Sequence, residues 1–194
     1  MTTNECNSAH LSFMYIRTCY FMVIEFAQII STLDQRPDTT DPVPIFMDKN
    51  DAISGIEHSI DHPADVTIKS SGTYVIIAAP QVGRKSGNEC SSIDFWLRKN
   101  GQDIPNSNVR ASLGINGQKD VIVNQTMIPF QAGDTINVMM AVEKTGEGLG
   151  IEAIKTPGRP LIPSIIFSIH KIKEETHGYW GSMNKGTKKE WVER

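Results

Sequence analysis

Apolar and polar residues alternate along most of the chain in short runs, a period of two that is typical of β-strands with one buried face. In residues 134–142, Ile136, Val138 and Met140 share one face, and Asn137 lies on the other. β-branched side chains, which fit a pleated surface, are common in these runs. Further runs of this kind cover residues 64–69, 93–98, 120–128 and 165–170.

Turn residues separate these runs. Lys99-Asn100-Gly101 and Asn116-Gly117 are hairpin signals, because Asn-Gly readily takes the positive φ values of a tight turn. No helical segment of useful length occurs outside the ends, so we expect helix only in the first or last twenty or so residues. The pattern predicts an all-β protein: an antiparallel two-sheet jelly-roll sandwich of about ten strands.

Two predicted strands are apolar on both faces. In residues 73–79, Val75, Ile77 and Ala79 point one way and alternate with a second apolar set, and residues 21–30 have the same character. An antiparallel sheet with one solvated face does not have this pattern. Since the chain has no spare helix to cover a second face, we expect a subunit interface there.

Four motifs resemble the complement component 1q and tumour necrosis factor superfamily over about residues 20–172. They are Gly72-Thr73-Tyr74-Val75-Ile76, Phe95-Trp96-Leu97-Arg98-Lys99-Asn100-Gly101, Gly133-Asp134-Thr135-Ile136-Asn137-Val138 and Ile166-Phe167-Ser168-Ile169. The stretch DFWLRKNGQDIPNSNVR, with the later AGD and the final IPS-strand, looks closest to collagen-free members in bacteriophages, large viruses and environmental bacteria.

The resemblance implies a ten-strand jelly roll that packs as a homotrimer around a threefold axis. The residues one and three places after the tyrosine of Gly-x-Tyr face that axis in the family, and here they are Val75 and Ile77. Ala79 follows on the same face, and Ile166, which precedes the phenylalanine of the closing strand, joins them. Family interfaces often use aromatic residues at such positions, whereas this sequence has aliphatic ones.

Charge and hydropathy restrict the partners. The 194 residues carry a net charge of −3 with a pI near 5.9, so no basic excess is available for nucleic acid or anionic membranes. Residues 11–30 are largely apolar, but a spanning helix would bury Arg17 and Glu25 at about 2.5–3.5 kcal/mol for a central charge. We therefore expect neither a membrane anchor nor, without a basic leader region, a signal peptide.

Cysteine and histidine spacing indicates no metal and no cofactor. Cys6, Cys19 and Cys90 form no C-x-x-C pair, and they are interpreted as thiols, with a Cys6–Cys90 or Cys19–Cys90 bridge as the alternative in an oxidising compartment. His58 and His62 have a zinc-like spacing, but Pro63 and Gly55 argue against a helix and no third ligand is evident.

No catalytic motif is evident in the sequence. No G-x-S-x-G motif occurs, and the Gly-rich residues 146–150 precede a strand-like segment, so they predict a hairpin loop and not a phosphate-binding loop. His170 is expected to face solvent from a strand. Asn124-Gln125-Thr126 is a glycosylation sequon inside a predicted strand. These observations favour a protein that is not an enzyme.

The expected organisation is an extension over residues 1–19, a jelly roll over 20–172 and a charged tail over 173–194, which is either frayed or a docking segment with Tyr179, Trp180 and Trp191 as anchors. The likeliest contact loops are residues 84–90, 100–108 and 143–150, because loops carry specificity on such scaffolds. Within them, the polar residues expected to bind a partner are Asp103, Asn106 and Asn108.

The sequence thus predicts a non-catalytic trimeric structural or recognition module on a virion, a phage or a cell surface. Its partners are expected to be a second and third copy of itself and a protein or glycan. Two alternatives stay open. A secreted or membrane-tethered cytokine-like ligand would need a working signal or anchor in residues 11–30. A sandwich-fold hydrolase or lyase would need a pocket with shifted titrating groups.

Overall fold

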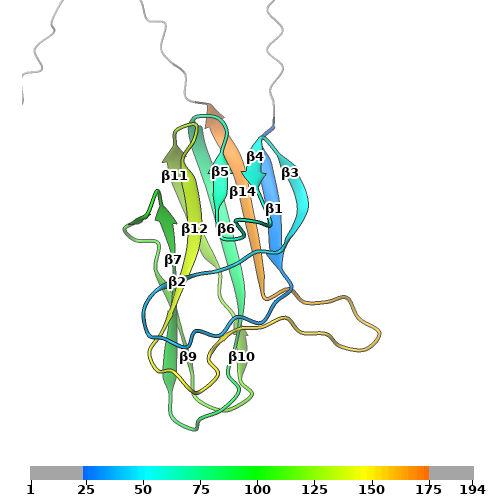
Figure 1. Cartoon of the computed structure of the whole chain (residues 1–194), viewed down its shortest axis with the longest axis vertical. Helices are drawn as coiled ribbons and strands as arrows, with labels where there is room; N and C mark the ends of the chain where they lie inside the picture. Colours follow the sequence, from blue (N-terminus) through cyan, green and yellow to red (C-terminus); the bar gives the residue numbers. More distant parts are fainter. Residues whose placement is uncertain (1–23, 175–194) are drawn as a thin grey trace, which may run out of the picture.

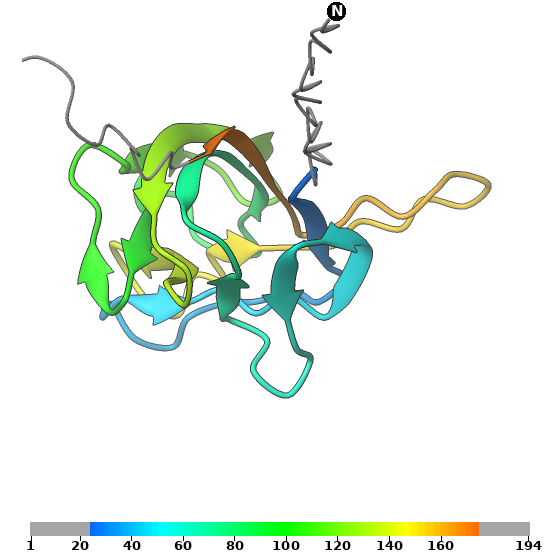
Figure 2. The ribbon, with the colours of Figure 1, turned by 90° about the horizontal axis from the view of Figure 1, so that it is seen from above.

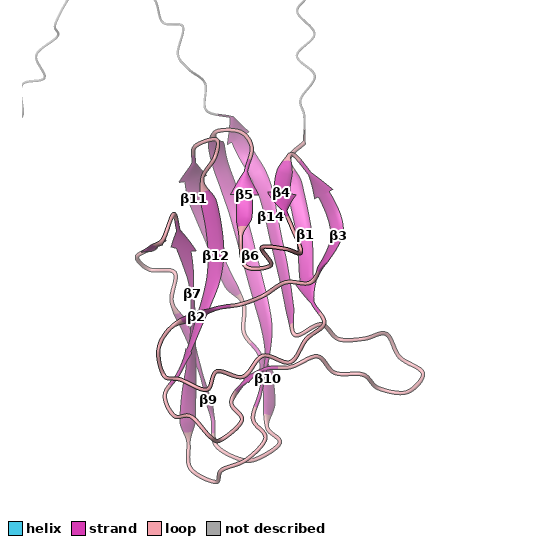
Figure 3. Cartoon of the chain, in the orientation of Figure 1, coloured by secondary structure: helices cyan, strands magenta, loops and turns pink. Residues whose placement is uncertain are grey.

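Every regular element of the described chain is a β-strand. The computed structural model describes residues 24–174, and Figures 1 and 3 show strands joined by loops throughout this part. The strands form two antiparallel sheets of seven strands each. The prediction of an all-β two-sheet sandwich is therefore confirmed, while the prediction about helix at the ends concerns residues outside the described range.

Sheet 1 is built around the long strand β6. It consists of β1 (Phe26–Ser31), β3 (Lys49–Ser54), β6 (Gly72–Gly83), β10 (Lys119–Val121), β11 (Asn124–Phe130), β13 (Gly150–Ile151) and β14 (Ile165–Glu174). Sheet 2 is centred on the pair β7–β12. It consists of β2 (Val43–Pro44), β4 (Ile56–His58), β5 (Val66–Ile68), β7 (Ser91–Lys99), β8 (Gln102–Asp103), β9 (Val109–Leu113) and β12 (Thr135–Val142).

The connectivity is that of a jelly roll. The chain passes from sheet 1 to sheet 2 and back repeatedly, so that β1, β6 and β14 of sheet 1 are separated in sequence by strands of sheet 2. In sheet 1 the spatial order is β11–β6–β14–β1–β3, and in sheet 2 it is β4–β5–β12–β7–β9. Few neighbouring strands are neighbours in sequence, which is typical of Greek-key β-sandwiches.

The core lies between the two sheets and is built from the alternation seen in the sequence. In β7, Ile93, Phe95 and Leu97 are buried, while the residues between them are partly exposed. The buried ring of Tyr74 in β6 meets the edge of the Phe130 ring at a centroid distance of 5.7 Å and an interplanar angle of 85°. Such an edge-to-face contact adds to the stabilisation from burial alone.

The tight turn after β7 is the one that Asn-Gly predicts. Asn100 has φ 49° and Gly101 has φ 78°, the left-handed values that a two-residue hairpin turn requires. The side chain of Asn100 also accepts a hydrogen bond from the Thr135 amide at 2.8 Å, which fixes the turn against the start of β12.

Strand β6 extends between two ends of the sandwich. Its first residue, Gly72, pairs with Glu174, and its last, Gly83, pairs with Gly150 of β13 and Lys119 of β10. We call the end near Gly72 the entry pole and the end near Gly83 the far pole; at about 3.3 Å per residue they lie roughly 36 Å apart. Between β13 and β14 the chain leaves the sandwich as a projecting arm, closed by an Ile154–Ile162 bridge (Figures 1 and 2).

Candidate functional site

The outward side of sheet 1 carries the residues that the sequence assigned to an interface. Val75, Ile77 and Ala79 alternate along β6 with the core residues, and Ile166 lies directly opposite Ala79 on β14. The register adds further apolar neighbours on the same side, since Val75 lies opposite Met127. We call this surface the outer apolar face. Its members are Phe26, Ile30, Val75, Ile77, Ala79, Met127 and Ile166.

Exposure varies across the outer apolar face. Ile166 is 39% exposed and Met127 is 64% exposed, whereas Val75 and Ile77 are partly covered by their neighbours. Polar residues interrupt it in the middle, because Ile77 lies between Ser168 of β14 and Gln125 of β11. The structure thus brings the four predicted interface residues onto one surface. Their role as a trimer contact stays a prediction.

A buried ionic cluster lies beneath the entry pole, and the sequence did not indicate it. The Glu25 carboxylate accepts hydrogen bonds from the Tyr74 hydroxyl at 2.6 Å, the Lys171 ammonium at 3.2 Å and the Ser70 hydroxyl. Burial works to raise the pKa of Glu25, but the hydrogen bonds from Ser70, Tyr74 and Lys171 outweigh it, so the pKa is lowered from its usual value. Burial and the neighbouring Glu25 both raise the pKa of Tyr74.

Glu25 therefore has a structural explanation. It was one of the two charges that argued against a membrane span in residues 11–30, and here it joins the start of β1 to β6 and β14. Within the described part of the chain, no helix is long and apolar enough to cross a membrane.

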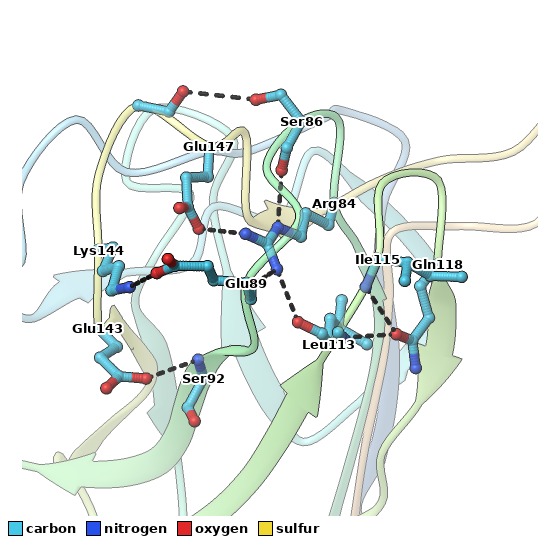
Figure 4. Close-up of polar contacts among 12 residues, drawn as sticks. Arg84, Ser86, Glu89, Ser92, Leu113, Ile115, Gln118, Glu143, Lys144 and Glu147 are labelled. Atoms are coloured by element: carbon cyan, nitrogen blue, oxygen red, sulfur yellow. Dashed lines mark hydrogen bonds and ion pairs between the residues drawn. The ribbon is translucent and has the colours of Figure 1, made fainter.

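At the far pole, a buried arginine connects two of the predicted contact loops (Figure 4). The Arg84 side chain is fully buried; it donates to the carbonyls of Ser86 at 2.7 Å and Leu113 at 2.8 Å, and to that of Glu89. It also forms an ion pair with Glu147 of the 143–150 loop. Loops 84–90 and 143–150 are thus one connected unit, and Arg84 acts as its internal support.

The remaining contact loop lies elsewhere. Residues 100–108 follow the opposite end of β7 from loop 84–90, so the three predicted contact loops do not form one surface. Backbone hydrogen bonds also join loops 84–90 and 143–150, since the amides of Lys85 and Ser86 donate to the carbonyls of Gly148 and Glu147.

Asp103, Asn106 and Asn108 line one pocket. This pocket has a volume of about 410 Å³ and lies on the outward side of sheet 2, against the indole of Trp96. The other residues that line it are Asp94, Ile104, Pro105 and Ala141. A volume of this size is within the range of small-molecule binding sites. The structure brings together the three residues that the sequence proposed for partner contact, and it adds an aromatic wall that the sequence analysis did not assign.

Both carboxylates of the pocket are paired with arginine side chains. Asp94 accepts two hydrogen bonds from Arg110, at 2.8 and 2.7 Å. Oδ1 of Asp103 accepts hydrogen bonds from the indole N–H of Trp96 and from Nε of Arg98, both at 2.7 Å. The hydrogen bond from Arg98, followed by that from Trp96, lowers the pKa of Asp103. The pocket therefore presents two neutralised ion pairs and not a free acidic cluster.

His58 and His62, the pair with a zinc-like spacing, lie in different surroundings. Nδ1 of His58 lies 2.7 Å from Oδ1 of Asn50 and Nε2 lies 3.3 Å from the carbonyl of Pro63, so protein groups occupy both ring nitrogens. His62 lies in the following turn. Among residues 24–174, no group of three or more His, Cys, Asp or Glu side chains could hold a metal ion. His170 is exposed, as expected, and stacks on Phe26 at 6.3 Å.

Three further sequence signals have clear positions. Asn124 begins β11 and is only 3% exposed, and its amide donates to the carbonyl of Ser107. Cys90 is a free, exposed thiol at the far pole. The two alternative bridges involve Cys6 or Cys19, which are outside the described residues. Residues 146–149 form a loop that leads into β13, but this loop is not the predicted hairpin, because β12 lies in sheet 2 and β13 pairs with β6 in sheet 1.

The architecture and surfaces define an antiparallel jelly-roll protein with an apolar outer sheet and a tryptophan pocket on the opposite sheet. Comparison with known proteins finds no matching family model and no matching curated protein. Among solved structures, the chain is similar to murine APRIL, a jelly roll of the tumour necrosis factor family, with a TM-score of 0.48 and 10% identity. That similarity covers 77% of this chain and 99% of the other.

Proposed function

We propose that the chain is a non-catalytic recognition module that works as a homotrimer. The observation that carries this proposal is the outer apolar face of sheet 1. Large aliphatic side chains stand on the solvent side of an antiparallel sheet, where one polar, solvated face is the rule. Ile166 is 39% exposed and Met127 is 64% exposed within the described chain, so this surface is open in a single copy.

Self-association accounts for this surface economically. β6 and β14 lie in the middle of sheet 1 and bear the aliphatic residues, so a threefold contact would bury Val75, Ile77, Ala79 and Ile166 of each copy. In the middle of the outer apolar face, the polar residues Ser168 and Gln125 lie on either side of Ile77. This mixture of polar and apolar side chains fits an assembly of moderate affinity. Sheet 2 and both ends of the sandwich would stay accessible for a partner.

The proposed setting is a virion or an extracellular surface. The net charge of −3 supports a protein or glycan partner over nucleic acid or an anionic membrane. Loops that carry polar side chains around a rigid sandwich are where such a scaffold binds partners.

The assembly is tested by the substitution Ile77→Asp. In a trimer it would desolvate three carboxylates near one axis, at several kcal/mol per buried ion, and we expect monomers at micromolar concentration. The matched control is Ile115→Asp, the same change at a loop residue that is 65% exposed and is not part of the outer apolar face. The measurement is the mass in solution by gel filtration with light scattering.

The monomeric variant should keep its fold, because Ile77 points away from the core between the sheets. Its circular dichroism spectrum should therefore match that of the unmodified chain. A monomeric unmodified chain would refute the proposed assembly. A trimer that persists in Ile77→Asp would show that another surface forms the contact.

A further inference from the structure

From the Trp96 pocket, we propose that the chain binds a neutral oligosaccharide there, with the indole as the platform for a sugar ring. This inference rests on the recognition role proposed above and specifies its partner. Trp96 lies on the outward side of β7 and is partly exposed, while its neighbours Phe95 and Leu97 fill the core. An indole at the wall of an open pocket offers a flat, electron-rich face, which attracts the weakly positive C–H groups of a sugar ring.

The indole is held in place. Its N–H donates to Asp103 at 2.7 Å, and the same carboxylate oxygen accepts from Arg98. The polar edge of the ring is thereby satisfied, so its orientation is fixed before any ligand arrives. A rigid aromatic platform costs little conformational entropy on binding.

The pocket wall formed by residues 104–108 is also held in place. Ser107 is buried, and its hydroxyl donates to the Ile104 carbonyl at 2.8 Å and accepts from the Leu97 amide at 3.1 Å. Because Ser107 is held inside, its two neighbours Asn106 and Asn108 are exposed. Asn106 has φ 62°, a left-handed conformation that is uncommon for a residue other than glycine and that often marks functional loops.

Free hydrogen-bonding groups line this wall. No hydrogen bond from residues 24–174 reaches the side-chain amide of Asn106 or Asn108, or Oδ2 of Asp103. The two amides offer both donors and acceptors, and the carboxylate oxygen offers an acceptor. This combination suits vicinal hydroxyl groups, each of which can donate and accept.

The charge of the pocket selects against anions. Asp94 is neutralised by Arg110 and Asp103 by Arg98, so no unpaired cation lines the pocket to attract a phosphate, sulfate or carboxylate group. The site is therefore suited to neutral sugars and unsuited to sialylated or sulfated ones.

The groove is long enough for more than one sugar unit. A second pocket of about 330 Å³ shares Asp103, Ile104 and Pro105 with the first and continues along Asn100, Gln102 and Lys99. The Lys99 ammonium is paired with Asp134 at 2.7 Å. Both pockets belong to sheet 2 and its loops, whereas the outer apolar face belongs to sheet 1. A trimer formed through sheet 1 would leave three such sites open, and binding to a glycan-covered surface would gain from multivalency.

The test is a binding screen of the full chain against immobilised neutral oligosaccharides of glucose, galactose, mannose and N-acetylglucosamine, with sialylated and sulfated oligosaccharides and a random peptide library as comparators. We expect binding to at least one neutral member. Trp96→Ala should weaken it about tenfold or more, the scale of losing an aromatic stacking platform. The double variant Asn106→Ala/Asn108→Ala should also weaken binding by about tenfold or more, because each lost hydrogen bond weakens it about fivefold.

The matched control is Asn88→Ala, an exposed amide in the 84–90 loop outside the pocket, which should bind as the unmodified chain does. Trp96→Phe keeps an aromatic ring in place and should lose less affinity than Trp96→Ala, which separates stacking from a loss of folding. No binding to neutral oligosaccharides, binding only to anionic ones or to peptides, or binding that survives the Trp96 and Asn106/Asn108 variants would each overturn the proposal.

The monomeric variant separates this inference from the proposed assembly. Ile77→Asp should keep the affinity of each site for a soluble neutral oligosaccharide and lose only the multivalent gain on a surface. If the unmodified chain is monomeric but binds, the assembly proposal fails and the sugar site stands. If it is trimeric and no neutral oligosaccharide binds, the sugar site fails and the assembly stands.

Discussion

Substitution of Arg84 by alanine tests whether the two loops at the far pole are supported from within. The Arg84 side chain is 0% exposed, and its removal leaves the carbonyl of Leu113 and those of Ser86 and Glu89 without their charged donor. Breaking a buried ion pair from one side costs about 3–5 kcal/mol. Because its partner Glu147 is 23% exposed and can be rehydrated, we expect a loss of about 3 kcal/mol.

For a chain of this length, a loss of that size lowers the melting temperature by about 6–12 °C, at roughly 2–4 °C per kcal/mol. The assay is thermal unfolding followed by circular dichroism at one fixed protomer concentration, since association makes the midpoint concentration-dependent. Arg84→Lys keeps the charge but loses the forked donor set, so its midpoint should lie between those of Arg84→Ala and the unmodified chain.

The matched control is Lys85→Ala. Lys85 is the next residue, its side chain is 60% exposed, and its ion pair with Asp34 spans 3.5 Å. Such a surface pair contributes about 0–1 kcal/mol. If Arg84→Ala unfolds at the same temperature as Lys85→Ala, Arg84 does not support the loops and the reasoning is wrong.

Two further predictions concern the entry pole and the start of β11. Since the pKa of Glu25 is lowered in the fold, its contribution to stability is present above its unfolded pKa and is lost as the pH falls through the folded value. The Glu25→Gln variant should therefore be less stable than the unmodified chain at pH 7, and its stability should change less as the pH falls below about 5. Urea unfolding at a series of pH values measures both effects, and identical pH dependence in the two proteins would contradict this. Asn124 should carry no glycan when the chain is secreted from eukaryotic cells, because the residue is only 3% exposed and its amide is bonded to the Ser107 carbonyl. A mass spectrum with an Asn124-linked glycan would disprove it.

The pattern of the long strands β7 and β12 was predictable because one face of each is buried. β7 and β12 follow the alternation of their sequences, and the Asn100-Gly101 turn follows from the φ values that only such residues adopt readily. The two-sided run in residues 73–79 likewise predicted that β6 would have apolar side chains pointing outward.

Long-range polar partners were not predictable in the same way. Arg84 stands among Gly, Lys and Ser in a segment that reads as an exposed loop, and only the fold brings Leu113 and Glu147 to it. Glu25 lies in an apolar run, and its partner Tyr74 is 49 residues away. No local signal marks such pairs, because burial of a charge depends on what the tertiary fold places beside it.

The candidate pocket was predictable in part. Asp103, Asn106 and Asn108 were identified because polar residues cluster in one turn-rich loop. Trp96 was not, because its position on the strand alone does not reveal that the 104–108 loop folds back beside it. That return depends on Ser107, whose hydroxyl connects the loop to Leu97.

The antiparallel pairing of β1 with β14 has a practical consequence for anything joined to this sandwich. Phe26 pairs with His170, so the described chain enters and leaves at the same pole, while the loops supported by Arg84 lie at the other end of β6. A domain fused before β1 and a label attached after β14 would both sit at the entry pole. The far pole would point away from the attachment, so a tethered copy would present the loops supported by Arg84 without shielding them.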